Sequence, residues 1–129
     1  MSFKSNLINI VLVETSHPGN IGSVARAMKT MGLSSLSLVN PRKFPSGEAN
    51  ALSGNAGDVL ENAQIFNSIE DAIKDSTFVY ATSSRTRTIQ WPTVHAEEGA
   101  SLINGQVTSG KKVSILFGRE DRGLTNEEL

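Results

Sequence analysis

Two hydrophobic patterns follow one another at the start of the chain. Residues 6–13 form an almost unbroken apolar run rich in β-branched side chains, which is typical of a strand buried on both faces of a sheet. Over residues 21–31 the apolar positions instead recur every three or four residues, which predicts a helix with one apolar face. A proline and a glycine at positions 18 and 19 favour a turn between the two, and Asn20 is a suitable N-cap. We therefore predict a strand that runs through a short loop into a helix.

The rest of the chain alternates between the same two patterns. Further strands are predicted at residues 36–39, 64–66, 77–82 and 112–117, and further helices at residues 48–52, 58–63 and 94–103 and after Ser68. Gly32 is the expected C-cap of the first helix, and Ser68 is the expected N-cap of a short later one. Strands that alternate with helices indicate an α/β fold with a mostly parallel sheet flanked by helices.

The chain ends on a further helix signal. Thr125 and Glu128 match the two ends of a capping box, so a helix is expected to begin there. A single turn gains little against the cost of helix nucleation. We therefore expect residues 1–129 to form one domain that is incomplete at its C-terminal end.

Composition narrows the classes of function. The 129 residues carry a formal net charge of −1, which excludes a uniformly basic nucleic-acid surface but not a local basic patch. Cysteine is absent, which excludes disulfides and thiolate metal sites. His17 and His95 lack ligand spacing, so we expect no metal. No apolar run approaches membrane length and no cleavable signal pattern is found, so we expect a cytoplasmic protein with no membrane partner.

The segment between the first strand and its helix is the first candidate site. Ligands of open α/β sheets bind at the carboxyl ends of strands, and the free amides of a helix start favour anions. Arg26 lies about a turn and a half into the predicted helix, among uncharged neighbours. On these residues alone, a ligand site and an ordinary turn followed by a solvent-facing arginine both remain open.

All six arginines lie in or beside segments that follow predicted strands. They are Arg26, Arg42, Arg85, Arg87, Arg119 and Arg122. Such segments gather at one edge of a parallel sheet, and guanidinium groups bind phosphate in a bidentate manner. The pattern favours a polyanionic partner, although ordinary polar loops would produce it as well.

Three motifs resemble the SPOUT class of RNA 2′-O-methyltransferases, the SpoU/TrmH family. The first is Asn-x-Gly-x-x-x-Arg over residues 20–26, the second is the run at residues 81–87, and the third begins Phe-Gly-Arg-Glu and spans residues 117–128. Residues 83–92 are most similar to the branch of tRNA (cytidine/uridine-2′-O-)-methyltransferases. The resemblance spans essentially the whole chain.

The resemblance implies a fold, a methyl donor and an acceptor. The C-terminal part of such folds forms a trefoil knot, a rare exception among proteins. The implied donor is S-adenosyl-L-methionine, and its expected binding residues are Thr82, Ser83, Ser84 and Gly118. The implied acceptor is a ribose 2′-hydroxyl of tRNA, in this branch at the pyrimidine at position thirty-two, and the implied assembly is a homodimer that completes each site. The family's last motif, an Asn-Pro segment followed by Ser-Leu-Asn, is absent, so we expect the knot-forming segment to be missing and this chain alone to be inactive.

The same resemblance assigns catalytic roles to Arg26 and Asn20. A guanidinium group is almost never neutral, so it is a poor general base. We therefore expect Arg26 to hold a phosphate and stabilise the developing alkoxide, while Asn20 holds the turn and orients Arg26. The expected RNA-binding residues are Arg85, Arg87, Arg119 and Arg122. Glu120 is either an ion-pair partner of Arg26 or Arg119, or a solvated loop acid.

Three other functions remain open. They are methylation of another RNA such as ribosomal RNA, RNA binding without catalysis by the same fold, and binding of a small phosphate compound by an α/β domain. Binding of the methyl donor distinguishes an enzyme from a binding module. A small-molecule site predicts an RNA affinity that depends little on salt.

Overall fold

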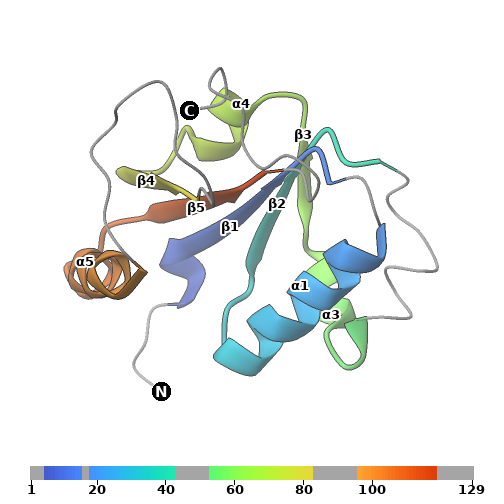
Figure 1. Cartoon of the computed structure of the whole chain (residues 1–129), viewed down its shortest axis with the longest axis horizontal. Helices are drawn as coiled ribbons and strands as arrows, with labels where there is room; N and C mark the ends of the chain where they lie inside the picture. Colours follow the sequence, from blue (N-terminus) through green and yellow to red (C-terminus); the bar gives the residue numbers. More distant parts are fainter. Residues whose placement is uncertain (1–4, 16–17, 43–52, 83–95, 119–129) are drawn as a thin grey trace.

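A five-stranded parallel sheet forms the centre of the protein (Figure 1). The computed structural model describes residues 5–15, 18–42, 53–82 and 96–118. The strands are β1 (Ile8–Val13), β2 (Ser35–Val39), β3 (Gln64–Phe66), β4 (Phe78–Ala81) and β5 (Val113–Phe117), in the order β3-β2-β1-β5-β4. All neighbouring pairs are parallel. The predicted strands and the α/β class are confirmed, with each strand boundary within two residues of its prediction.

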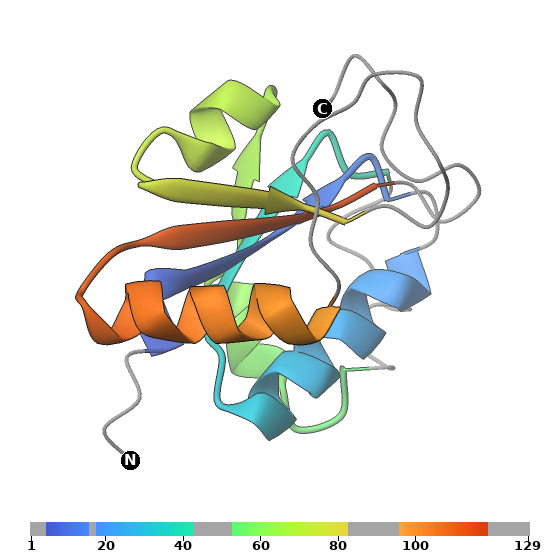
Figure 2. The same cartoon turned by 60° about the vertical axis from the view of Figure 1, so that its left-hand side comes forward.

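Helices cover both faces of this sheet (Figures 1 and 2). The helices α1 (Pro18–Met31), α3 (Gly57–Glu61) and α5 (Ala96–Thr108) lie on one face, and α4 (Ile69–Ile73) lies on the other. A short 3-10 helix, η1 (Ser5–Leu7), precedes β1. Every residue of β1 is buried, as its almost unbroken apolar pattern predicts for a central parallel strand.

Alternate residues of β1 pack into two separate cores. Ile10 and Leu12 join the core beneath α1, α3 and α5, together with Ile21 and Met28 of α1. Val11 belongs to the core on the α4 face. The period of two along β1 and of three to four along α1 therefore brings their apolar sides together.

The two ends of α1 test the predicted caps. The helix begins at Pro18, so Asn20 lies inside its first turn and the prediction that Asn20 is the N-cap is wrong. A proline suits the first helical position because its φ is already helical and its missing N–H is not needed there. The predicted C-cap is confirmed: Gly32 has φ +77°, its N–H donates to the Lys29 carbonyl oxygen at 3.1 Å, and the Leu33 N–H donates to the Met28 carbonyl oxygen at 2.8 Å.

The caps and bounds of the later helices match their predictions to different degrees. Ser68 caps α4 as predicted, because its hydroxyl accepts the Asp71 N–H at 3.2 Å. The helix predicted at residues 94–103 extends further, because α5 ends at Thr108. Gly99 lies within this helix and is buried. The helices predicted at residues 48–52 and from Thr125 lie outside the described residues.

Candidate functional site

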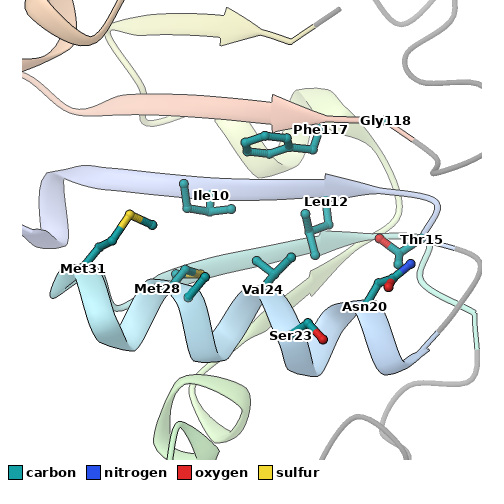
Figure 3. A pocket seen from close by; sticks show the side chains of 11 residues that line it. Ile10, Leu12, Thr15, Asn20, Ser23, Val24, Met28, Met31, Phe117 and Gly118 are labelled. Carbon is teal, nitrogen blue, oxygen red and sulfur yellow. The ribbon is translucent and has the colours of Figure 1, made fainter. Parts of the chain in front are cut away.

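A largely apolar cavity of about 480 Å³ lies between α1 and the ends of β1 and β5 (Figure 3). Its lining residues are Ile10, Leu12, Thr15, Asn20, Ser23, Val24, Ala27, Met28, Met31, Phe117 and Gly118. Its size falls within the range of small-molecule sites, and an apolar lining with a few polar groups is their usual composition.

Strand order explains why the cavity forms at this place. From β1 the chain passes through α1 to β2 on one side, whereas β5 pairs with β1 on the other side. Because β1 and β5 are parallel neighbours, their carboxyl ends lie side by side at one edge of the sheet. Open α/β sheets bind ligands in crevices beyond the carboxyl ends of their strands.

The polar groups of the cavity gather at its strand-exit end. Figure 3 shows Thr15 and Asn20 together there, while Met28 and Met31 lie toward the other end. Thr15 is buried, and its carbonyl oxygen accepts the Arg42 N–H at 3.3 Å. The arrangement offers one polar end and a long apolar wall to a bound molecule.

Two residues of the predicted site line this cavity, and a third does not. Asn20 and Gly118 are both lining residues, whereas Arg26 lies on α1 outside the cavity with an exposed side chain. Six residues of α-helix turn the direction of a side chain by roughly 240°. Among the described residues no hydrogen bond joins Asn20 to Arg26, so the structure does not bring these two side chains together.

Thr82, which is predicted to bind the methyl donor, lies where β4 ends beside β5. Its N–H and its hydroxyl both donate to the Leu116 carbonyl oxygen, at 3.0 Å and 2.9 Å. Because Ala81 pairs with Leu116, Thr82 and Gly118 follow the ends of two adjacent strands. The hydroxyl proton of Thr82 is thus used to hold β4 against β5.

The remaining predicted site residues lie outside the described residues. They are Ser83, Ser84, Arg85, Arg87, Arg119, Glu120 and Arg122. Met31 and Phe117, which were not predicted as site residues, also line the cavity and are 60% and 39% exposed. The only sequence signal for this was the position of Met31 at the end of an apolar stripe.

Two negative findings apply to the described part of the chain alone. It holds no group of three or more His, Cys, Asp or Glu side chains arranged to bind a metal ion. None of its helices is both long enough and apolar enough to cross a membrane.

Comparison with known proteins identifies the family. Residues 7–129 match the SpoU rRNA Methylase family. The chain belongs to this family. The resemblance found in the sequence motifs is thereby confirmed, and so is the SPOUT type of fold.

Individual SpoU-family relatives agree with this result. The chain is 48% identical over 122 residues to the tRNA (cytidine/uridine/adenosine-2′-O-)-methyltransferase TrmJ of Pseudomonas aeruginosa, covering 95% of this chain and 48% of that protein. The crystal structure of TrmJ from Z. mobilis ZM4 is 37% identical with a TM-score of 0.87, covering 93% of this chain and 53% of that one. The chain therefore spans about half the length of the relatives that it matches.

A more distant structure shares the fold of this SpoU-family chain. It is an AdoMet-bound rRNA methyltransferase from Sinorhizobium meliloti, 18% identical with a TM-score of 0.54, covering 98% of this chain and 45% of that one. At this identity the likeness concerns the fold alone.

Proposed function

We propose that this SpoU-family chain belongs to an enzyme that transfers a methyl group from S-adenosyl-L-methionine to a ribose 2′-hydroxyl of tRNA. The proposed acceptor is the pyrimidine at position thirty-two of the anticodon loop. The observation that carries the proposal is the likeness to the tRNA methyltransferase TrmJ along 95% of the chain. Action on tRNA also makes the cytoplasm its proposed location.

The chemical character of the residues that line the cavity suits the proposed methyl donor. The apolar wall with the exposed ring of Phe117 suits a flat adenine ring, and the end with Asn20 and Thr15 suits polar groups. Thr82, Ser83, Ser84 and Gly118 are the residues proposed to hold the donor. When bound, S-adenosyl-L-methionine supplies a methyl group already activated on a sulfonium. The match to the SpoU rRNA Methylase family supports binding of a methyl donor.

Arg26 is proposed to act on the acceptor rather than on the donor. Its side chain is exposed, lies outside the cavity and forms no ion pair within the described residues. A guanidinium in this position is available to hold an RNA phosphate, and a second N–H stabilises the alkoxide as negative charge develops. The hydroxyl proton leaves to that phosphate or to water, because Arg26 cannot accept it. Asn20 is proposed to contribute from the polar end of the cavity.

The proposed RNA contacts come from arginines beyond the strand ends. Arg85 and Arg87 follow β4, and Arg119 and Arg122 follow β5, two strands that are adjacent in the sheet. Segments that follow adjacent parallel strands begin at one edge of the sheet, so these four arginines are proposed to contact one phosphate backbone. Glu120 is proposed to pair with Arg119 or Arg26.

The proposal includes a homodimer. Met31 and Phe117 leave apolar surface exposed along the cavity, and a second copy would cover such surface. Analytical ultracentrifugation of the protein tests this part, and a monomer at all concentrations would contradict it.

The central experiment measures methyl transfer and its position. The enzyme that contains this chain is incubated with radiolabelled S-adenosyl-L-methionine and a tRNA transcript, and the modified nucleotide is mapped by nuclease digestion and mass spectrometry. A 2′-O-methylated pyrimidine at position thirty-two is expected. The matched control is the same tRNA with a 2′-deoxyribose at that position, which should accept no methyl group.

The family description favours one second candidate, methylation of ribosomal RNA. Methyl transfer to a ribosomal RNA fragment but not to tRNA would support it. Binding of RNA without binding of S-adenosylhomocysteine, measured by calorimetry, would contradict both enzymatic functions.

A further inference from the structure

The side chain of Arg26 lies beside a turn of the chain that contains Gly54. A Cβ atom added to Gly54 would lie 3.8 Å from Arg26 Cδ and 3.9 Å from Arg26 Nε. These are ordinary van der Waals distances, so the single atom would just fill the space between the turn and the arginine. A longer side chain at this position would reach the guanidinium group itself.

The backbone of this turn is held in place. Gly54 has φ +59°, a left-handed conformation that glycine adopts at little cost. The Ala56 N–H donates to the Ser53 carbonyl oxygen at 3.0 Å, and both residues are buried. The wall beside Arg26 therefore has a defined position.

An ion pair ties the segment after the turn to α1. Lys29 lies three residues after Arg26, and its Nζ lies 2.8 Å from Asp58 Oδ2 in the first turn of α3. The hydrogen bond from Lys29 holds the pKa of Asp58 below its ordinary value. Lys29 occupies this carboxylate, and Arg26 forms no ion pair within the described residues.

We propose that Gly54 is a positioning residue for Arg26: its turn confines the arginine side chain from one side, and the Lys29–Asp58 pair keeps the turn against α1. The inference rests on the proposed function, in which Arg26 holds a phosphate of the substrate. Position 54 must then meet two requirements: its backbone must be left-handed, and it must carry no side chain. Only the absence of a side chain concerns Arg26.

Two glycines of the chain allow these requirements to be separated. Gly54 and Gly110 both have positive φ, +59° and +83°, but a Cβ on Gly110 would meet nothing within 4 Å. Asparagine tolerates the left-handed region better than most residues. Gly54→Asn and Gly110→Asn therefore carry a similar backbone cost, and only Gly54→Asn places a side chain against Arg26.

The experiment compares both variants in tRNA methylation, with thermal denaturation as a check on folding. We expect Gly54→Asn to lower kcat by about 10-fold to 100-fold, because small displacements of a catalytic group cost that much, while KM for the methyl donor stays within about twofold. Gly110→Asn should retain kcat within about twofold. The Arg26 Nε–Hε NMR signal, assigned by its loss in Arg26→Lys, should shift in Gly54→Asn and stay in place in Gly110→Asn.

Double variants show whether Gly54 acts through Arg26. In an Arg26→Ala background, Gly54→Asn should lower single-turnover methyl transfer no further. A further loss of the same size would overturn the inference, as would an unmoved Arg26 signal with normal turnover in Gly54→Asn. If Arg26→Ala itself has normal turnover, the role of Arg26 fails and the inference fails with it. If Arg26→Ala is inactive but Gly54→Asn matches Gly110→Asn, only the positioning inference fails.

Discussion

The side-chain oxygen of Asn9 accepts a hydrogen bond of 2.8 Å from the hydroxyl of Ser37, across the boundary between β1 and β2. The amide nitrogen of Asn9 donates to Ser114 Oγ at 3.2 Å on β5 and to the Ala72 carbonyl oxygen at 3.3 Å in α4. One buried amide thus joins three neighbouring strands to the helix that covers them. Because a slip of one residue would turn these groups to the opposite face, the network specifies the register of the sheet.

Replacing Asn9 should destabilise the fold strongly. Asn9→Leu leaves the buried hydroxyls of Ser37 and Ser114 without this partner, so we expect the free energy of unfolding to fall by about 2–4 kcal/mol. Urea denaturation measures this change. Adding Ser37→Ala to Asn9→Leu should recover part of the loss, because the unpaired hydroxyl of Ser37 is then gone. No recovery would show that the cost comes from packing.

A pair of glycine substitutions should have opposite effects. Gly32→Ala forces alanine into φ +77° and should lower the free energy of unfolding by about 1–2 kcal/mol. Gly57, the first residue of α3, has space around its Cβ position, so Gly57→Ala should be neutral or stabilising by up to about 1 kcal/mol. Thermal or urea denaturation distinguishes the two. Equal effects of both substitutions would contradict the C-cap assignment of Gly32.

The Lys29–Asp58 pair predicts a dependence of stability on pH. The hydrogen bond from Lys29 lowers the pKa of Asp58 below its ordinary value of 3.8. Because the folded-state pKa is the lower one, the contribution is fully present above the unfolded-state pKa and is lost as pH falls through the folded-state pKa. The stability difference between the protein and Asp58→Asn should therefore stay constant above about pH 5 and shrink below about pH 4. It should also decrease in high salt, since both side chains are exposed to solvent. A difference that persists unchanged at pH 3 would contradict this assignment.

Arg26 should affect turnover far more than donor binding. We expect Arg26→Ala to lower kcat by about 100-fold or more, because it removes a donor that stabilises charge in the transition state. Its affinity for S-adenosylhomocysteine, measured by calorimetry, should change little, since Arg26 lies outside the cavity. Arg26→Lys should rescue poorly, because an ammonium group cannot reproduce the bidentate contact. Near-normal turnover in either variant would remove Arg26 from the mechanism.

The arginines beyond β4 and β5 should control the salt dependence of tRNA binding. We expect each alanine variant of Arg85, Arg87, Arg119 and Arg122 to make the fall of log K for tRNA binding with log salt concentration less steep, by up to about one. A variant with one phosphate contact fewer releases fewer counterions when it binds. Lys74→Ala is a control, because Lys74 follows α4 rather than a strand end. Wild-type slopes in all four variants would mean that these arginines do not contact phosphate.

Residues a few positions apart determine much of this fold, and the sequence was sufficient to predict that part. The five strands follow from short runs rich in apolar residues, and the caps at Gly32 and Ser68 follow from local backbone geometry. The wrong N-cap at Asn20 has a local cause as well, because Pro18 starts the helix two residues earlier. The motifs at residues 20–26, 81–87 and 117–128 were together also enough to name the family.

Tertiary structure alone decided which of the named residues share a site. The pairing of β5 with β1 brings Gly118 to the same cavity as Asn20, and the turn of α1 directs Arg26 elsewhere. Asn9 meets Ser114 across 105 positions of sequence, and Gly54 meets Arg26 through the packing of the chain after β2 against α1. No local pattern contains these contacts, because each depends on the order in which strands pair and on which face of a helix the sheet buries.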